Sequence, residues 1–229
     1  MGFIAFHGCE KCGSRDNLAE YDNGFYCFGC GYKKPKRDLS RFNAIKTSKP
    51  YDGITLEKSL ARDHLKWILG YNLTPNEMKH FASCHSRMIK GVEIPCNLLI
   101  FLNTENYWCG RNFDAGVKYL SSGVKPYVEF RTENSKNTLV FVEDVISAVK
   151  VSRVAVGVPI LGAIVPNSFW QRAREYDRVI LWGDRDKARE NIIQSKRASE
   201  LVGKLVQNVI TENDPKKYDT EFILTKINY

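Results

Sequence analysis

Several features are missing from this sequence, and each absence excludes a class of protein. No apolar run approaches the length of a membrane span and no charged-then-apolar leader pattern occurs, so we expect a soluble, cytoplasmic protein. No G-x-x-x-x-G-K-S/T phosphate loop occurs, so the 229 residues carry no P-loop motor. The seven cysteines are odd in number and do not suggest a disulfide framework, which indicates a reducing compartment.

Four of those cysteines form the sharpest motif in the chain. Two C-x2-C pairs, Cys9 with Cys12 and Cys27 with Cys30, are separated by 14 residues. Each pair lets two thiolates converge on one ion, and four thiolates complete a tetrahedral zinc shell. The sequence therefore predicts a zinc ribbon over residues 1–32 that holds one structural Zn²⁺. One alternative is that the zinc ion of such a ribbon serves only to stabilise a small fold; the other is that the ribbon also contacts nucleic acid.

The positive charge is concentrated just after these cysteines. Residues 31–49 contain seven basic side chains and one acidic one, so +6 of the net +8 lies there and the other 210 residues share about +2. Residues 33–50 are polar, contain two prolines and lack an apolar period. This composition therefore predicts a flexible basic linker over 33–50 and an anionic partner.

Residues 51–137 form the next section, and they predict a helical and mixed subdomain. Apolar side chains recur at spacings of three to four over 55–82, which is typical of helices. Short strands are expected at 97–102, 107–113 and 118–120, with a hairpin turn between the first two.

The last section, 138–229, alternates strands with helices. Strands are predicted at 138–142, 153–158, 178–182 and 208–211, with helices between them, including one over 144–151 and a long amphipathic one after the third strand. This alternation predicts an α/β domain whose parallel sheet is covered by helices on both faces.

Acidic residues recur where three of those strands end. Glu143 follows the first strand, Asp184 and Asp186 follow the third, and Asp214 follows the fourth. Ligands gather at the carboxyl ends of parallel strands, and carboxylate oxygens suit Mg²⁺ or Mn²⁺. Single acids at such places often only cap helices, but the recurrence favours a metal site. The alternate spacing of the Asp-x-Asp pair predicts that its two carboxylates point the same way.

These acids carry a family resemblance. A glutamate after an apolar strand, a later Asp-x-Asp and a downstream Asp-Pro together resemble the TOPRIM domain of primases and topoisomerases. Upstream, Arg111 in Gly-Arg-Asn-Phe followed by Lys118-Tyr-Leu resembles the basic segment that precedes TOPRIM in bacterial-type primases. With the ribbon in front, the order is similar to the primase half of bacteriophage primase–helicases of the T-seven type.

The resemblance implies synthesis of short RNA primers on single-stranded DNA from ribonucleoside triphosphates, in a phage-infected bacterial cell. It implies Mg²⁺ or Mn²⁺ at Glu143, Asp184 and Asp186, with Asp214 contributing through waters. Because the sequence contains no P-loop motif, we also expect a separate replicative helicase as partner. The implied nucleic-acid or nucleotide contacts are the basic and aromatic residues His7, Arg15, Tyr26, Phe28, Lys33, Lys34, Arg111, Lys118 and Lys187.

Two positions depart from the TOPRIM pattern. The glutamate is usually followed by glycine and, four residues on, often by aspartate, whereas this chain has Asp144 and Ser147 there. Because of these departures, one alternative is a regulator that binds nucleic acid through its zinc ribbon and whose TOPRIM domain is inactive. A TOPRIM nuclease is the other alternative.

Overall fold

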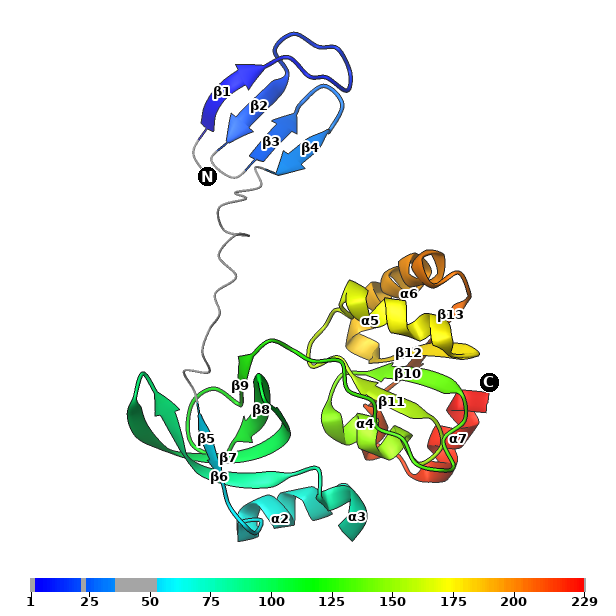
Figure 1. The fold of residues 1–229 in the computed structure, drawn as a ribbon. Helices are drawn as coiled ribbons and strands as arrows, with labels where there is room; N and C mark the ends of the chain where they lie inside the picture. The colour runs from blue at the N-terminus through cyan, green and yellow to red at the C-terminus, as the bar shows by residue number, and fades with distance from the viewer. Residues whose placement is uncertain (1–2, 22–23, 36–52, 229) are drawn as a thin grey trace. The chain divides into compact units, whose positions relative to one another are not determined.

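A computed structural model describes residues 3–21, 24–35 and 53–228 (Figure 1). The chain divides into two compact units, Met1–Lys49 and Pro50–Tyr229. Most of the predicted basic linker, residues 36–50, lies outside the described residues, so its flexibility stays a prediction. None of the described helices is long and apolar enough to cross a membrane.

The first unit is an antiparallel sheet of four strands in the order β1-β2-β3-β4. The strands are β1 (Phe3–His7), β2 (Leu18–Tyr21), β3 (Gly24–Cys27) and β4 (Lys33–Pro35). Strand β4 pairs with β3, so the sheet extends three residues beyond the predicted end of the ribbon at residue 32.

Two glycines close the knuckles of this unit. Gly13 and Gly31 both have φ +71°, a left-handed conformation that other residues adopt only at a cost. Their amides donate to the carbonyls of Cys9 and Cys27 at 2.8 and 2.9 Å, which turns the chain back toward the first cysteine of each pair.

The second unit begins with a five-stranded antiparallel sheet, ordered β5-β6-β7-β8-β9. Its strands are β5 (Ile54–Leu56), β6 (Ala82–Ile89), β7 (Val92–Thr104), β8 (Tyr107–Asn112) and β9 (Tyr119–Gly123). The hairpin between β7 and β8 confirms the predicted turn.

The helical prediction over 55–82 was correct only in part. Residues of its first turn form the strand β5, and two short helices follow, α2 (Arg62–Leu69) and α3 (Pro75–Met78). Thr74 caps α3 in a capping box with Glu77, and Pro75 begins it. Strand β6 and the first half of β7 were not predicted, because residues 83–96 lack a clear alternation and are ordered by pairing with their neighbours.

The rest of the second unit is a parallel sheet in the order β11-β10-β12-β13. Its strands are β10 (Thr138–Val142), β11 (Val156–Pro159), β12 (Arg178–Asp184) and β13 (Val206–Thr211). All three strand pairings are parallel, as the alternation predicts. Four α-helices accompany the sheet, α4 (Val145–Val151), α5 (Asn167–Arg172), α6 (Ala188–Val202) and α7 (Thr220–Asn228), of which α7 was not predicted.

Alternate residues of the central strands enter two different cores. Leu139 and Phe141 of β10 pack with residues of α5 and α6, whereas Val140 and Val142 pack with residues of α4 and α7. The second core continues into the antiparallel sheet through residues such as Leu99 and Phe101. The shared core joins the two halves of this unit, so the carboxyl ends of the parallel strands have a fixed wall beside them.

Candidate metal centres and active site

The four cysteines of the ribbon converge. Their Sγ atoms all lie within 4.8 Å of one another, with Cys9–Cys30 at 3.8 Å and Cys12–Cys27 at 3.7 Å. Tetrahedral zinc with Zn–S bonds of about 2.3 Å requires sulfurs about 3.8 Å apart, so the cluster fits a Zn²⁺ ion. A hydrogen bond to Ser14 lowers the pKa of the Cys12 thiol to about 6, which favours the thiolate that zinc needs.

The ribbon residues implied to contact nucleic acid lie on different faces of its sheet. Cross-strand register places Tyr26 and Lys33 on one face, in a row with Phe6, and His7 on the other. Lys33 lies 5.6 Å from the Tyr26 ring, and the Phe28 ring meets Tyr26 edge-on at 5.0 Å. These side chains make an aromatic and basic surface of the kind on which bases stack.

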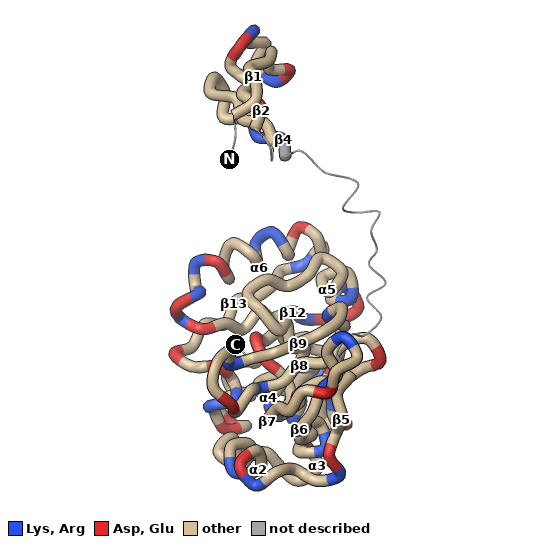
Figure 2. Tube along the Cα trace, turned by 90° about the vertical axis from the view of Figure 1, so that its left-hand side faces the viewer, with Lys and Arg blue, Asp and Glu red and all other residues tan. Residues whose placement is uncertain are grey.

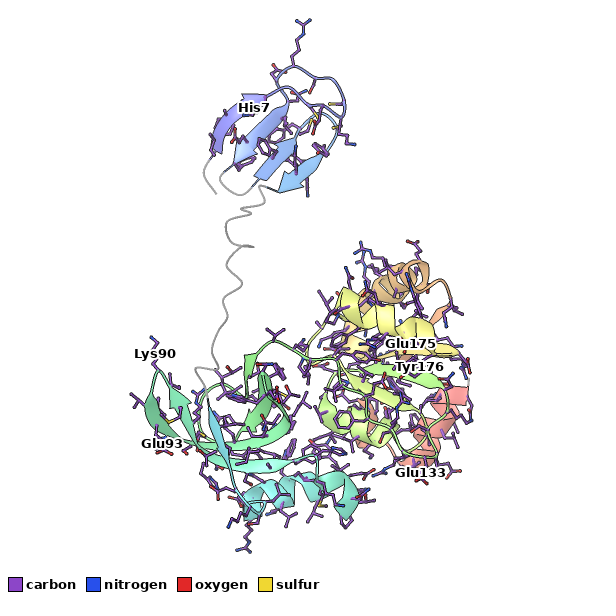
Figure 3. The ribbon with its side chains drawn as sticks, in the orientation of Figure 1. His7, Lys90, Glu93, Glu133, Glu175 and Tyr176 are labelled. Carbon is purple, nitrogen blue, oxygen red and sulfur yellow. The ribbon has the colours of Figure 1, made fainter. Side chains whose placement is uncertain are left out.

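Two of the remaining ribbon candidates, His7 and Lys34, contact glutamates of the ribbon. His7 (Figure 3) contacts Glu20 at 2.5 Å, and Lys34 lies 3.5 Å from Glu10. Sequence reasoning missed the apolar side chains that join the aromatic face. Phe6 on this face is 57% exposed. The sequence signal for it was that neighbouring strand residues point to opposite faces, so Phe6 lies on the face opposite to His7. Arg15 lies in the loop between β1 and β2.

Three carboxylates meet at the carboxyl edge of the parallel sheet. Side-chain oxygens of Glu143, Asp184 and Asp214 lie within 4.8 Å of one another, although 71 residues separate the first from the last. Glu143 and Asp214 follow β10 and β13, and Asp184 is the last residue of β12; these are adjacent strands that run the same way. Asp184 Oδ1 is buried and has no hydrogen-bond partner among the described residues, so a cation would satisfy an atom that is otherwise costly to bury. The donor set and this atom fit Mg²⁺ or Mn²⁺.

The electrostatics of the cluster also favour a cation. Burial, the hydrogen bond with Asp214 and the negative charges nearby raise the pKa of Asp184 to about 7. Burial acts in the same direction on Asp214, but hydrogen bonds from Asp184 and Lys216 outweigh it and lower the pKa of Asp214. The raised pKa of Asp184 reflects the cost of placing its negative charge beside other carboxylates, a cost that a bound cation would remove.

Asp186 does not join this cluster. Strand β12 ends at Asp184, and the chain turns at once into a 3-10 helix over Arg185–Lys187. The sequence predicted that both carboxylates of the Asp-x-Asp pair point the same way, which requires an extended chain. The chain is not extended after Asp184, so the basis of that prediction is absent. Asp214, expected as a secondary contributor through waters, lies in the cluster itself.

Lysines surround the carboxylates. Lys187 Nζ lies 3.0 Å from Glu143 Oε2, and its side chain is 37% exposed. Lys216 donates to Asp144 Oδ2 at 2.6 Å and to Asp214. Sequence reasoning missed Lys216, whose only signal was its place two residues after Asp214. Charges of both signs lie along α6 (Figure 2), so the helix that follows Lys187 is not a basic surface.

Two basic residues on and beside the antiparallel sheet, Arg111 and Lys118, lie close to aromatic rings. Arg111 lies on β8 with its guanidinium 4.8 Å from the Trp67 ring and 5.9 Å from the Tyr119 ring. Stacking of this kind holds the guanidinium plane, and within the part of the chain that the structure describes Arg111 Nε is buried without a hydrogen-bond partner. Lys118 precedes β9, 5.4 Å from the same tyrosine ring.

A cavity connects this sheet with the acidic edge. It has a volume of about 270 Å³, and its lining includes Tyr119 and Ser121 from β9, together with Glu143, Asp144 and Lys216. A larger cavity of about 510 Å³, lined by residues such as His80 and Arg131, contains none of the predicted site residues. The acidic edge therefore has space beside it for a substrate group.

No family model and no curated protein matches this chain. Its weak likenesses to solved structures include two to bacteriophage T7 proteins. One is the primase fragment of the bacteriophage T7 primase-helicase, at 12% identity and a TM-score of 0.36, covering 99% of this chain and 98% of that one. The other comes from the structure of the T7 lagging-strand DNA polymerase interacting with primase domains bound to an RNA/DNA hybrid and dTTP, at 11% identity and a TM-score of 0.30, covering 79% of each chain. Both TM-scores are below 0.5, so neither likeness establishes a function.

Proposed function

We propose that the chain is a DNA primase, which makes short RNA primers on single-stranded DNA by metal-dependent nucleotidyl transfer. The observation that carries the proposal is the cluster of Glu143, Asp184 and Asp214 with the buried, unpartnered Asp184 Oδ1, beside a cavity at the end of a parallel sheet. The resemblance of the motif order to TOPRIM primases supplies the reaction class.

The acidic residues would hold Mg²⁺ or Mn²⁺, which supplies charge neutralisation for the transferring phosphate and lowers the pKa of the attacking hydroxyl. Glu143, Asp184 and Asp214 provide the ligand oxygens. Asp186 lies outside this set, and we assign it a supporting electrostatic role, because its charge contributes to the raised pKa of Asp184.

The basic residues would bind the anionic substrates. Lys187 reaches the cluster through Glu143 and is exposed enough to turn toward a triphosphate. Arg111 lies on β8 and Lys118 directly precedes β9, and these two strands supply one wall of the cavity, where both side chains would hold template or nucleotide phosphate.

The ribbon would contact the template. Tyr26 and Phe28 offer ring faces to unstacked bases, and Lys33 offers a charge to the backbone. We further propose that a replicative helicase is the partner that delivers the single strand.

Primer synthesis by the full chain tests the proposal. Zinc-loaded protein is incubated with single-stranded DNA of varied sequence, labelled ribonucleoside triphosphates and Mg²⁺ or Mn²⁺. Short oligoribonucleotides are expected, and their absence on every template would overturn the assignment. Shortened DNA would identify a nuclease instead, and tight DNA binding without any product would identify a regulator.

A further inference from the structure

Lys216 lies in an unusual position for a residue so close to a metal site. Its ammonium contacts two carboxylates, Asp144 Oδ2 at 2.6 Å and Asp214 Oδ2, and its side chain is only 19% exposed. Its backbone amide also lies 3.4 Å from Ser147 Oγ. The residue is therefore held at both its backbone and its charged end.

The partners of Lys216 are themselves fixed. Asp144 is the N-cap of α4, and its Oδ1 accepts the Ser147 amide at 3.0 Å while its Oδ2 accepts the Ser147 hydroxyl at 3.2 Å. The two departures from the TOPRIM pattern are thus one connected unit that anchors the lysine. Lys187, by contrast, has a single carboxylate contact and is 37% exposed, so an incoming cation can displace it from Glu143 more readily.

We propose that Lys216 is a resident cation of the acidic site, which replaces one of two divalent ions and orients Asp214, so that the cluster binds one metal ion. Sites for phosphoryl transfer often hold two ions about 3.5–4 Å apart. Here an ammonium already occupies the side of the cluster between Asp144 and Asp214. A second divalent ion there would have to displace a half-buried ammonium from two carboxylates.

The charge balance agrees with a single ion. The three carboxylates of the cluster and Asp144 carry four negative charges, and the two lysines that contact them carry two positive ones, which leaves a formal charge of −2. One divalent ion reduces this charge to zero, and two would make it +2. Lys216 also lines the cavity beside the cluster, where an ammonium can meet a substrate phosphate.

The inference rests on the proposed metal-dependent function, but metal binding tests it without any primer assay. Mn²⁺ is titrated into the zinc-loaded full chain and free Mn²⁺ is followed by electron paramagnetic resonance. Sites of the cluster are those that Asp184→Asn abolishes. One such site is expected. Two would overturn the inference and leave the proposed function intact, whereas none would overturn both.

Variants then test the lysine itself. Lys216→Gln removes the positive charge and is expected to tighten Mn²⁺ binding at least tenfold, about 1.4 kcal/mol, because the ion no longer meets a neighbouring cation. A smaller change would overturn the inference. Lys216→Arg keeps the charge and is expected to bind Mn²⁺ within threefold of the wild type, and a tenfold change there would count against it.

A neighbouring lysine provides the matched control. Lys217 carries the same charge one residue away, and its ammonium lies 5.1 Å from the Tyr71 ring. Lys217→Gln is expected to change Mn²⁺ affinity less than threefold. If it tightens binding as much as Lys216→Gln does, the effect is one of net charge and Lys216 has no special role. Thermal unfolding of each variant shows that it is folded.

Discussion

The two candidate metal centres of this protein are built in opposite ways. The four cysteines lie within 22 residues of one another in sequence, on knuckles closed by glycine turns. The three carboxylates come from three strands of a sheet and span 72 residues. A small module built around a local metal site depends on metal binding for its fold. A site assembled from distant strands depends instead on a hydrophobic core that forms without the metal.

The largest effect expected from this contrast follows loss of a zinc ligand. Cys27→Ser should unfold the ribbon, because a module this small has little core apart from the metal. The second unit should keep its own unfolding transition. Zinc content and limited proteolysis measure the two results. The control is Cys96→Ser, outside the cluster, which should keep one zinc per chain. A Cys27→Ser ribbon that resists proteolysis without zinc would contradict the prediction.

The opposite behaviour is expected at the acidic centre. Asp184→Asn should abolish primer synthesis, a loss of about a thousandfold or more for the removal of a charged ligand at the reacting phosphate. The fold should persist and affinity for single-stranded DNA should stay within threefold, because the lost oxygen does not contact the template. Asp177→Asn, at an exposed position before the same strand, is the control. Collapse of the fold in Asp184→Asn would remove the distinction between the two centres.

A third prediction concerns the contact that ties the helical segment to the parallel sheet. Arg153 donates to Glu77 from Nε at 2.6 Å and from Nη2 at 2.8 Å, and it also reaches Thr220. Arg153→Ala should lower the free energy of unfolding of the second unit by about 2–3 kcal/mol, since it leaves a half-buried carboxylate unpaired. The ribbon should be unaffected. Arg172→Ala, an exposed arginine, should change stability by less than about 0.5 kcal/mol.

This ion pair also gives a pH dependence. Burial acts to raise the pKa of Glu77, but hydrogen bonds from Arg153 and Thr74 outweigh it, so the folded-state pKa lies below the ordinary value of 4.5. The stabilisation is therefore complete above pH 4.5 and is lost as the pH falls through the folded pKa. Urea unfolding should show the difference between wild type and Arg153→Ala shrinking below pH 4.5. A difference that is constant down to pH 2 would contradict the assignment.

The smallest effect is expected on the aromatic face of the ribbon. Tyr26→Ala should weaken binding of single-stranded DNA by about 1–3 kcal/mol, the range for loss of one stacked base. Tyr26→Phe keeps the ring and should bind within threefold of the wild type. Fluorescence anisotropy at fixed salt measures both. Equal binding by Tyr26→Ala would mean that the ring only packs against Phe28.

Much of this architecture could be predicted from the sequence. The knuckle spacing places four thiolates together because a C-x2-C turn brings its two sulfurs to one side within a few residues. The strand at 138–142 and the parallel alternation after it were predicted correctly, since fully buried strands require continuous apolar runs. Glu143, Asp184 and Asp214 were all recognised as residues at strand ends.

Only the tertiary structure decided which acids meet and what surrounds them. Asp186 leaves the cluster because the chain turns at Asp184, and Asp214 enters it because β13 pairs beside β12. Lys216 becomes a partner of Asp144 through packing of distant segments, and Arg111 stacks on Trp67 in the same way. Short-range spacing specifies a site whose ligands share a turn, whereas a site made by separate strands is specified by the pairing and packing that bring them together.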